Sequence, residues 1–143
     1  MKKLSRNKGF TLIEILVVIG IIAILATIVI IAINPSRQFK QARDTQRTSN
    51  VNAILNAIGQ YVADNKGDLP SVPSGEVNQA LCDDLVPMYL PSLPTDPNSD
   101  SKGSSITCSG ISTNDVGYDT SVSGGRVTVS APDAELSTIS VTR

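Results

Sequence analysis

A long run of apolar residues occupies the first quarter of the chain. Between residues 10 and 33 the only charged side chain is Glu14, and residues 15–33 are aliphatic apart from Gly20 and Thr27. Nineteen helical residues rise about 28 Å, which is close to the thickness of a bilayer's hydrocarbon core. A secretory signal peptide predicts a shorter apolar run that ends in a small-residue cleavage site. The pattern therefore predicts a transmembrane helix, and a plain signal anchor is one form that it can take.

Beyond Pro35 the hydrophobic positions keep a helical spacing to about Asn65, where Asn65-Lys66-Gly67 supplies a stop. The apolar members of this helix are Val51, Ile54, Leu55, Ile58, Tyr61 and Val62. The same face is basic closer to the apolar run, at Arg37, Lys40, Arg43 and Arg47. We expect the apolar part to pack on the rest of the chain. The basic part should project below it at headgroup level, either as a solvated or lipid-facing patch or in specific pairs.

The remaining residues, 68–143, combine one short helical pattern with several alternating segments. A loop over 68–75 precedes a short helix, EVNQALCDDL, and a Pro-rich stretch follows it. Alternation of apolar and polar residues then predicts strands in SITCSG, VGYDTSVS, RVTVSA and LSTISV. Gly124-Gly125 predicts a tight hairpin between two of them. The fold class is therefore α+β, with a small antiparallel sheet packed on the long helix through Val127, Val129 and their neighbours.

The residues before the apolar run are KKLSRNKG-FTLIE: a short basic leader, a glycine, a phenylalanine and a carboxylate four residues later. This arrangement resembles the N-terminal signal of type IV pilins and of the pseudopilins of type II secretion. In that family a membrane peptidase cuts after the glycine and methylates the new N-terminus. The resemblance implies cleavage between Gly9 and Phe10 and N-methylation of Phe10. It also implies a pilin-like fold.

Cleavage would explain why a carboxylate stands inside the apolar run. It creates an α-amino group on Phe10, one helical turn before Glu14, and an intramembrane carboxylate needs an opposite charge. The pair can form within one helix, or between the Glu14 of one subunit and the Phe10 amine of the next. The second arrangement sets an axial register, because any other stagger leaves both charges unpaired. The resemblance implies this intermolecular pairing in filament assembly.

The resemblance divides the chain into four parts. These are a cleaved leader (1–9), a transmembrane and assembly helix (10–34), an amphipathic helix that continues the rod (35–67) and a small extracytoplasmic head (68–143). Many similar pilins carry a helix-breaking proline where Ile31 stands, whereas here Pro35 follows one turn later.

Composition narrows the function. The chain has no histidine, which excludes Ser-His and Cys-His nucleophile arrangements, and no two acids pair in an obvious apolar pocket. We therefore do not expect an enzyme. Residues 1–67 carry nine cations against three acids, while residues 68–143 carry ten acids against three cations. The acidic part argues against nucleic-acid binding, and we identify no direct nucleic-acid site.

Two further features concern the head. Cys82 and Cys108 are the only cysteines, and in an exported domain they are most simply one disulfide. Asp96, Asn98 and Asp100 place oxygen side chains at alternate positions, as calcium loops do. The EF-hand positions for glycine and glutamate hold other residues, so a solvated turn is favoured and no cofactor is expected.

We therefore expect a prepilin, a subunit of a type IV pilus-like filament for adhesion, motility or DNA uptake. A type II secretion pseudopilin and a signal-anchored binding protein that never polymerises are the alternatives. The expected partners are copies of itself and related pilins, the prepilin peptidase, inner-membrane assembly machinery and the lipid bilayer. Cations flank both sides of the membrane segment, so only the resemblance gives the orientation. It implies one pass through the bacterial cytoplasmic membrane, with the leader cytoplasmic and the head outside, before entry into a surface or periplasmic filament.

Overall fold

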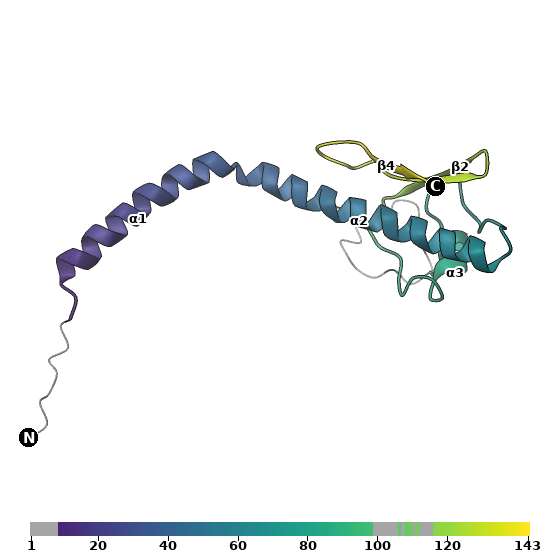
Figure 1. Ribbon diagram of the computed structural model, residues 1–143, viewed down its shortest axis with the longest axis horizontal. Coiled ribbons are helices and arrows are strands. Elements are labelled where there is room, and N and C mark those ends of the chain that lie inside the picture. Colours follow the sequence, from purple (N-terminus) through teal and green to yellow (C-terminus); the bar gives the residue numbers. More distant parts are fainter. Residues whose placement is uncertain (1–8, 99–105, 107, 110, 112–115) are drawn as a thin grey trace, which may run out of the picture. The chain divides into compact units, whose positions relative to one another are not determined.

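A computed structural model describes residues 9–98, 106, 108, 109, 111 and 116–143 (Figure 1). The chain divides into two compact units, Met1–Gln38 and Phe39–Arg143. The first unit contains the apolar helix, and the second contains the sheet and the hydrophobic core. The α+β class predicted from the hydrophobic pattern is confirmed.

Two consecutive long helices occupy the N-terminal half of the chain, α1 (Leu12–Ile33) and α2 (Pro35–Asp64). Asn34 lies between them as the C-cap of α1, with φ of 48° in the left-handed region that asparagine tolerates better than most residues. Pro35 then opens α2, where its missing N–H costs no helical hydrogen bond. The helical hydrogen bonding is therefore interrupted directly before the proline.

Helix α2 presents the predicted apolar face to the core. Its buried apolar residues are Val51, Ile54, Leu55, Ala57 and Ile58. The short helix α3 (Gln79–Leu85) also matches the expectation, and it is capped at its start by the side chain of Asn78.

The sheet has four strands in the order β1-β2-β3-β4, and every neighbouring pair is antiparallel. The strands are β1 (Gly75–Glu76), β2 (Asp119–Ser123), β3 (Arg126–Ala131) and β4 (Ile139–Thr142). The last three confirm predicted strands. Gly124 and Gly125 form the turn between β2 and β3 with positive φ at both positions, as a tight hairpin requires.

One strand of the sheet was not expected from the sequence. It is β1, which pairs with β2 through Gly75 opposite Thr120. In the segment SITCSG the structure describes only residues 106, 108 and 109, and Ile106 forms an isolated bridge with Leu93. A strand as short as β1 has no alternation that a sequence pattern can reveal.

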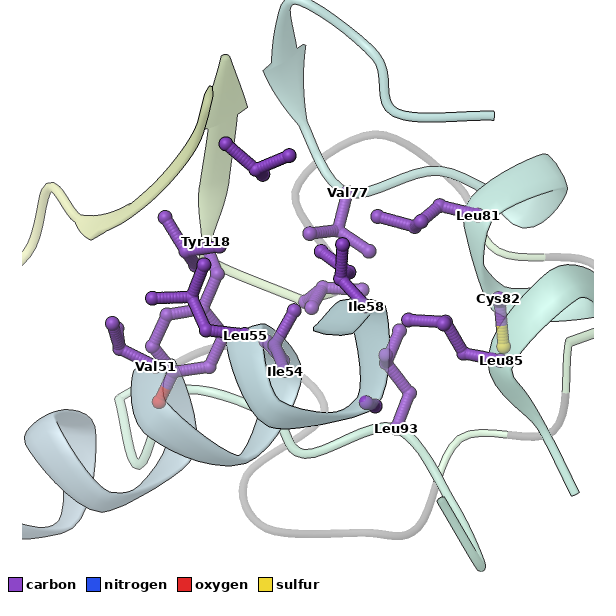
Figure 2. Close-up of a cluster of buried hydrophobic side chains, with 14 of the residues drawn as sticks. Val51, Ile54, Leu55, Ile58, Val77, Leu81, Cys82, Leu85, Leu93 and Tyr118 are labelled. Carbon is purple, nitrogen blue, oxygen red and sulfur yellow. The ribbon is translucent and has the colours of Figure 1, made fainter. Parts of the chain in front are cut away.

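The core of the second unit lies where α2, α3 and the sheet meet (Figure 2). Ile54 and Ile58 of α2 and Leu85 of α3 belong to this cluster, and Tyr118 lies beside Val51 and Leu55. From the sheet, Val127 and Val129 are buried in the same cluster. The predicted packing of the sheet on the helix through these two valines is confirmed.

Cys82 of α3 and Cys108 are joined by a disulfide, the pairing that the sequence favours. Their separation of 26 residues closes a loop that also contains Leu93 and Asp96. In the chain-entropy account, a loop of this size lowers the entropy of the unfolded chain by an amount worth about 3–4 kcal/mol. The disulfide therefore ties α3 to the chain that follows the Pro-rich segment.

Candidate functional site

The start of α1 contains the residues that the sequence marks for cleavage and assembly. Gly9 is exposed and lies outside the helix, and Phe10 is 85% exposed. Thr11 is the N-cap of α1, with extended backbone angles. The structure therefore leaves the Gly9–Phe10 bond outside the helix, where a peptidase can reach it without unwinding helical turns.

Glu14 is held at this helix start by a capping box. Its Oε2 accepts hydrogen bonds from the backbone N–H and the hydroxyl of Thr11, each at 2.8 Å. In return the Thr11 hydroxyl accepts from the backbone N–H of Glu14 at 3.3 Å. These bonds satisfy N–H groups that a helix start otherwise leaves without partners.

The capping box was missed by the sequence analysis, although a signal for it was present. Thr-Leu-Ile-Glu has the [ST]-x-x-[DE] spacing of a capping box directly before an apolar run. Both hydrogen bonds from Thr11 to the carboxylate use Oε2, and Oε1 of Glu14 accepts none from the described part of the chain. One carboxylate oxygen thus fixes the side chain while the other stays open to a further donor.

The surroundings of Glu14 are apolar. Ile13, Val17 and Val18 join Phe10 in a shallow hollow beside the carboxylate. None of the residues of α1 is buried in the single chain, and the helix is long and apolar enough to cross a membrane. Glu14 is therefore a single ionisable group on a helix whose whole surface needs an apolar surrounding.

A second cluster of charges lies inside the Phe39–Arg143 unit. Arg47 of α2 is fully buried, and its guanidinium binds both oxygens of the buried Asp96 carboxylate at 2.6 and 3.0 Å. The same guanidinium donates to Asp44 at 2.9 Å. The hydrogen bond to Asp96, together with the charges of both acids, raises the pKa of Arg47 against the effect of burial.

Asp44 and Arg43 extend this cluster to the loop between β3 and β4. The Asp44 carboxylate accepts from the backbone N–H groups of Glu135 and Leu136, at 3.0 and 2.8 Å. Arg43 binds Glu135 through two hydrogen bonds of 2.6 and 2.8 Å. Burial alone would raise the pKa of Asp44, but the two backbone donors and Arg47 outweigh it and lower that pKa. Arg43 likewise lowers the pKa of Glu135.

These contacts decide between the two arrangements expected for the basic face of α2, because Arg43 and Arg47 form specific pairs. Arg43 and Arg47 do not project from the second unit as a solvated or lipid-facing patch, because both bind acids of that unit. Their partners lie far away in the sequence, and the separation of Arg47 from Asp96 is 49 residues. No local pattern could have identified them. Lys40 of the same unit is exposed, as predicted.

The calcium candidates are in a different setting from a solvated turn. Asp96 is buried with both oxygens bound to Arg47, and its Oδ1 also accepts from the backbone N–H of Asn98. Asn98 is exposed, and Asp100 lies outside the described residues. A cation at Asp96 would compete with the guanidinium that already neutralises it. Among the residues that the structure describes, no group of three or more metal-ligating side chains is present.

Comparison with known proteins places the chain in a family. Residues 4–30 match the family model described as "Prokaryotic N-terminal methylation motif". Over 105 residues the chain is 30% identical to the type II secretion system core protein G of Escherichia coli K12, covering 68% of this chain and 70% of that protein. No solved structure matches it. The methylation motif, the apolar helix and this similarity lead to one conclusion: the chain belongs to the pilin and pseudopilin family.

Proposed function

We propose that this protein is a filament subunit that is cut between Gly9 and Phe10, methylated on Phe10 and polymerised through α1. The observation that carries the proposal is Glu14. It is one carboxylate, fixed by Thr11 at the start of a 22-residue helix that has no buried residue in the single chain. Such a helix is unsatisfied as a monomer outside a bilayer, and neighbouring copies of itself supply an equally apolar surrounding.

The proposed contact joins Glu14 of one subunit to the Phe10 amine of the next. The Thr11 bonds leave Oε1 open, so a neighbouring ammonium group can bind it without breaking the capping box. Two opposite charges in an apolar bundle strongly favour the stagger that brings them together. Before assembly, α1 would anchor the subunit in the cytoplasmic membrane, with the leader on the cytoplasmic side and the Phe39–Arg143 unit outside.

Two kinds of filament fit this mechanism. A surface pilus would serve adhesion, motility or DNA uptake, and a pseudopilus would act in type II secretion. The similarity to a secretion core protein favours the pseudopilus as the second candidate function. Deleting the gene separates them. Loss of sheared surface filaments with normal protein secretion would support the pilus, and loss of secretion with unchanged surface filaments would support the pseudopilus.

The test of polymerisation is a Glu14→Ala substitution, compared with wild type at equal membrane levels. Mass spectrometry should find both proteins starting at a methylated Phe10, because the substitution lies outside the cut bond. The yield of filaments should fall below detection for Glu14→Ala, since the neighbour's amine is stranded at every contact, at a typical cost of ~3–5 kcal/mol.

The matched control is Asp68→Ala, which removes one negative charge from an exposed position after α2. It should leave the filament yield unchanged. A wild-type yield from Glu14→Ala would refute the role of the carboxylate in assembly. An N-terminus at Met1 would refute the processing step.

A further inference from the structure

One part of the Phe39–Arg143 unit exposes apolar side chains that its own core does not cover. Phe39, at the start of this unit, is 65% exposed, and Leu136 in the β3–β4 loop is 45% exposed. Lys40 is exposed beside Phe39. We call Phe39, Lys40 and Leu136 together the Phe39–Leu136 surface.

The ion cluster explains how these residues come to share one region. Phe39 and Lys40 lie one helical turn before Arg43 and Asp44, so they continue the same side of α2. Arg43 and Asp44 are the residues that bind the β3–β4 loop, through Glu135 and the backbone N–H of Leu136. The loop therefore contacts α2 one turn after Phe39 and Lys40, and these two side chains stay exposed.

The geometry points to the surface of the lipid bilayer as the partner of the Phe39–Leu136 surface. Five residues lie between Ile33, the last residue of the apolar helix, and Phe39, so even a fully extended chain would span only about 20 Å from one to the other. The headgroup region begins where the hydrocarbon core ends. Phe and Leu are side chains that enter the boundary between headgroups and acyl chains, while a neighbouring lysine keeps its ammonium group in water.

The charges favour apolar insertion over attraction to anionic lipids. Arg43 and Glu135 neutralise one another at 2.6 Å, and the exposed Asp133 of the same loop offsets Lys40, which leaves the exposed Arg37 as one further cation nearby. The docked surface should therefore form on zwitterionic bilayers as well as on anionic ones. The inference rests on the anchoring of α1 in a membrane and not on polymerisation, so it describes the subunit before assembly.

The test uses the absence of tryptophan from the chain. Three full-length variants, Phe39→Trp, Leu136→Trp and Met88→Trp, each carry one fluorophore at an exposed apolar position. Met88 is the matched control. It is 79% exposed in the same unit, and the adjacent Tyr89 packs against Tyr61 near the far end of α2. Each variant is reconstituted in phosphatidylcholine vesicles with and without lipids brominated on the acyl chains, which quench tryptophan on contact.

Emission from Phe39→Trp and Leu136→Trp should fall severalfold more than emission from Met88→Trp. Leu136 is decisive, because it is about a hundred residues from α1 in the sequence and chain connectivity alone does not bring it to the bilayer. Adding Phe39→Ser to Leu136→Trp should reduce the quenching.

Equal quenching of Leu136→Trp and Met88→Trp would overturn the inference. Quenching at Leu136 that vanishes as the protein is diluted in lipid would also overturn it, since a second copy would then be the partner. The vesicles contain no assembly machinery, so this result does not depend on whether the protein forms filaments.

Discussion

Arg47 is a buried cation whose charge is balanced by Asp44 of the same helix and by Asp96 from a distant segment. It binds Asp96 with two hydrogen bonds and Asp44 with one, and its side chain is not exposed at all. Buried ion pairs contribute little net stability over apolar residues of the same volume, but removing one partner strands the other. The intact ion cluster therefore adds little to the stability of the fold, but loss of Arg47 would leave its two acids without the cation that neutralises them.

Replacing Arg47 by Met should destabilise the second unit by ~3–5 kcal/mol, because the buried Asp96 loses the guanidinium that binds both its oxygens. Urea unfolding in detergent measures this loss through the near-ultraviolet circular dichroism of tyrosine. All three tyrosines, Tyr61, Tyr89 and Tyr118, belong to the Phe39–Arg143 unit, so α1 does not contribute to the signal.

The double variant Arg47→Met with Asp96→Leu is the control for that prediction. It removes both members of the pair, and it should recover most of the lost stability. Destabilisation of the double variant by as much as the single one would show that the cost comes from packing and not from the stranded charge.

Thr11 supplies the second prediction at this scale. Thr11→Ala removes the hydroxyl that binds Glu14 and should weaken the start of α1 by ~0.5–2 kcal/mol, the usual effect of losing an N-cap. Hydrogen exchange of the Glu14 amide in micelles should become faster, while amides in the middle of α1 keep their rates. Thr11→Ser keeps the hydroxyl and should exchange like the wild type. Unchanged exchange in Thr11→Ala would contradict the capping box.

At the scale of elements, the β3–β4 loop is held to α2 by two carboxylates whose pKa values are lowered in the folded state, Asp44 and Glu135. In the unfolded chain these groups titrate near pH 4. Around and just below that pH, the unfolded state therefore binds more protons than the folded state. The stability that they contribute is present above about pH 4 and is lost as the pH falls through their lower folded values.

The urea midpoint of the second unit should therefore fall as the medium is acidified below about pH 4. Combining Asp44→Asn with Glu135→Gln should lower the midpoint at neutral pH and flatten its pH dependence. Asp68→Asn, at an exposed position, should preserve the wild-type profile. A wild-type midpoint that does not change on acidification would rule out this loop as an acid-sensitive contact.

The elements also show which features a sequence pattern can reveal. The helices and the strands β2, β3 and β4 were predictable, because their apolar residues recur with the period of the structure that buries them. The candidate site at Gly9, Phe10 and Glu14 was inferred from adjacent residues, and the role of these residues stays a prediction. The two-residue strand β1 has no period, and the interruption at Asn34 depends on a single backbone conformation. The contacts of Arg47 join segments that only folding brings together.

At the scale of the whole molecule, the two units differ in how they satisfy their apolar residues. The Phe39–Arg143 unit has a core of buried residues from α2, α3 and the sheet, whereas α1 has none. A fragment that begins at Phe39 retains the core, the disulfide and the ion cluster.

This fragment should fold as a monomer without detergent and unfold in urea at nearly the same midpoint as the full chain in detergent. Tyrosine circular dichroism and sedimentation give the two measurements. A fragment that lacks a cooperative transition would show that the second unit needs α1 or the membrane to fold.

Apart from Glu14, helix α1 has the same apolar character on every side, and the hydroxyl of Thr27 is satisfied by the backbone of Ala23 within its own helix. The energy of apolar packing against a neighbouring helix should therefore change little when α1 rotates about its own axis. If the subunits polymerise through α1 as proposed, exchanges among Ile, Val and Leu along this helix should leave them interchangeable, and a different chain with the same Thr-x-x-Glu start could enter the same filament. Compatibility between subunits would then be decided by four residues at one end of the helix, which leaves the remaining length free to vary in evolution.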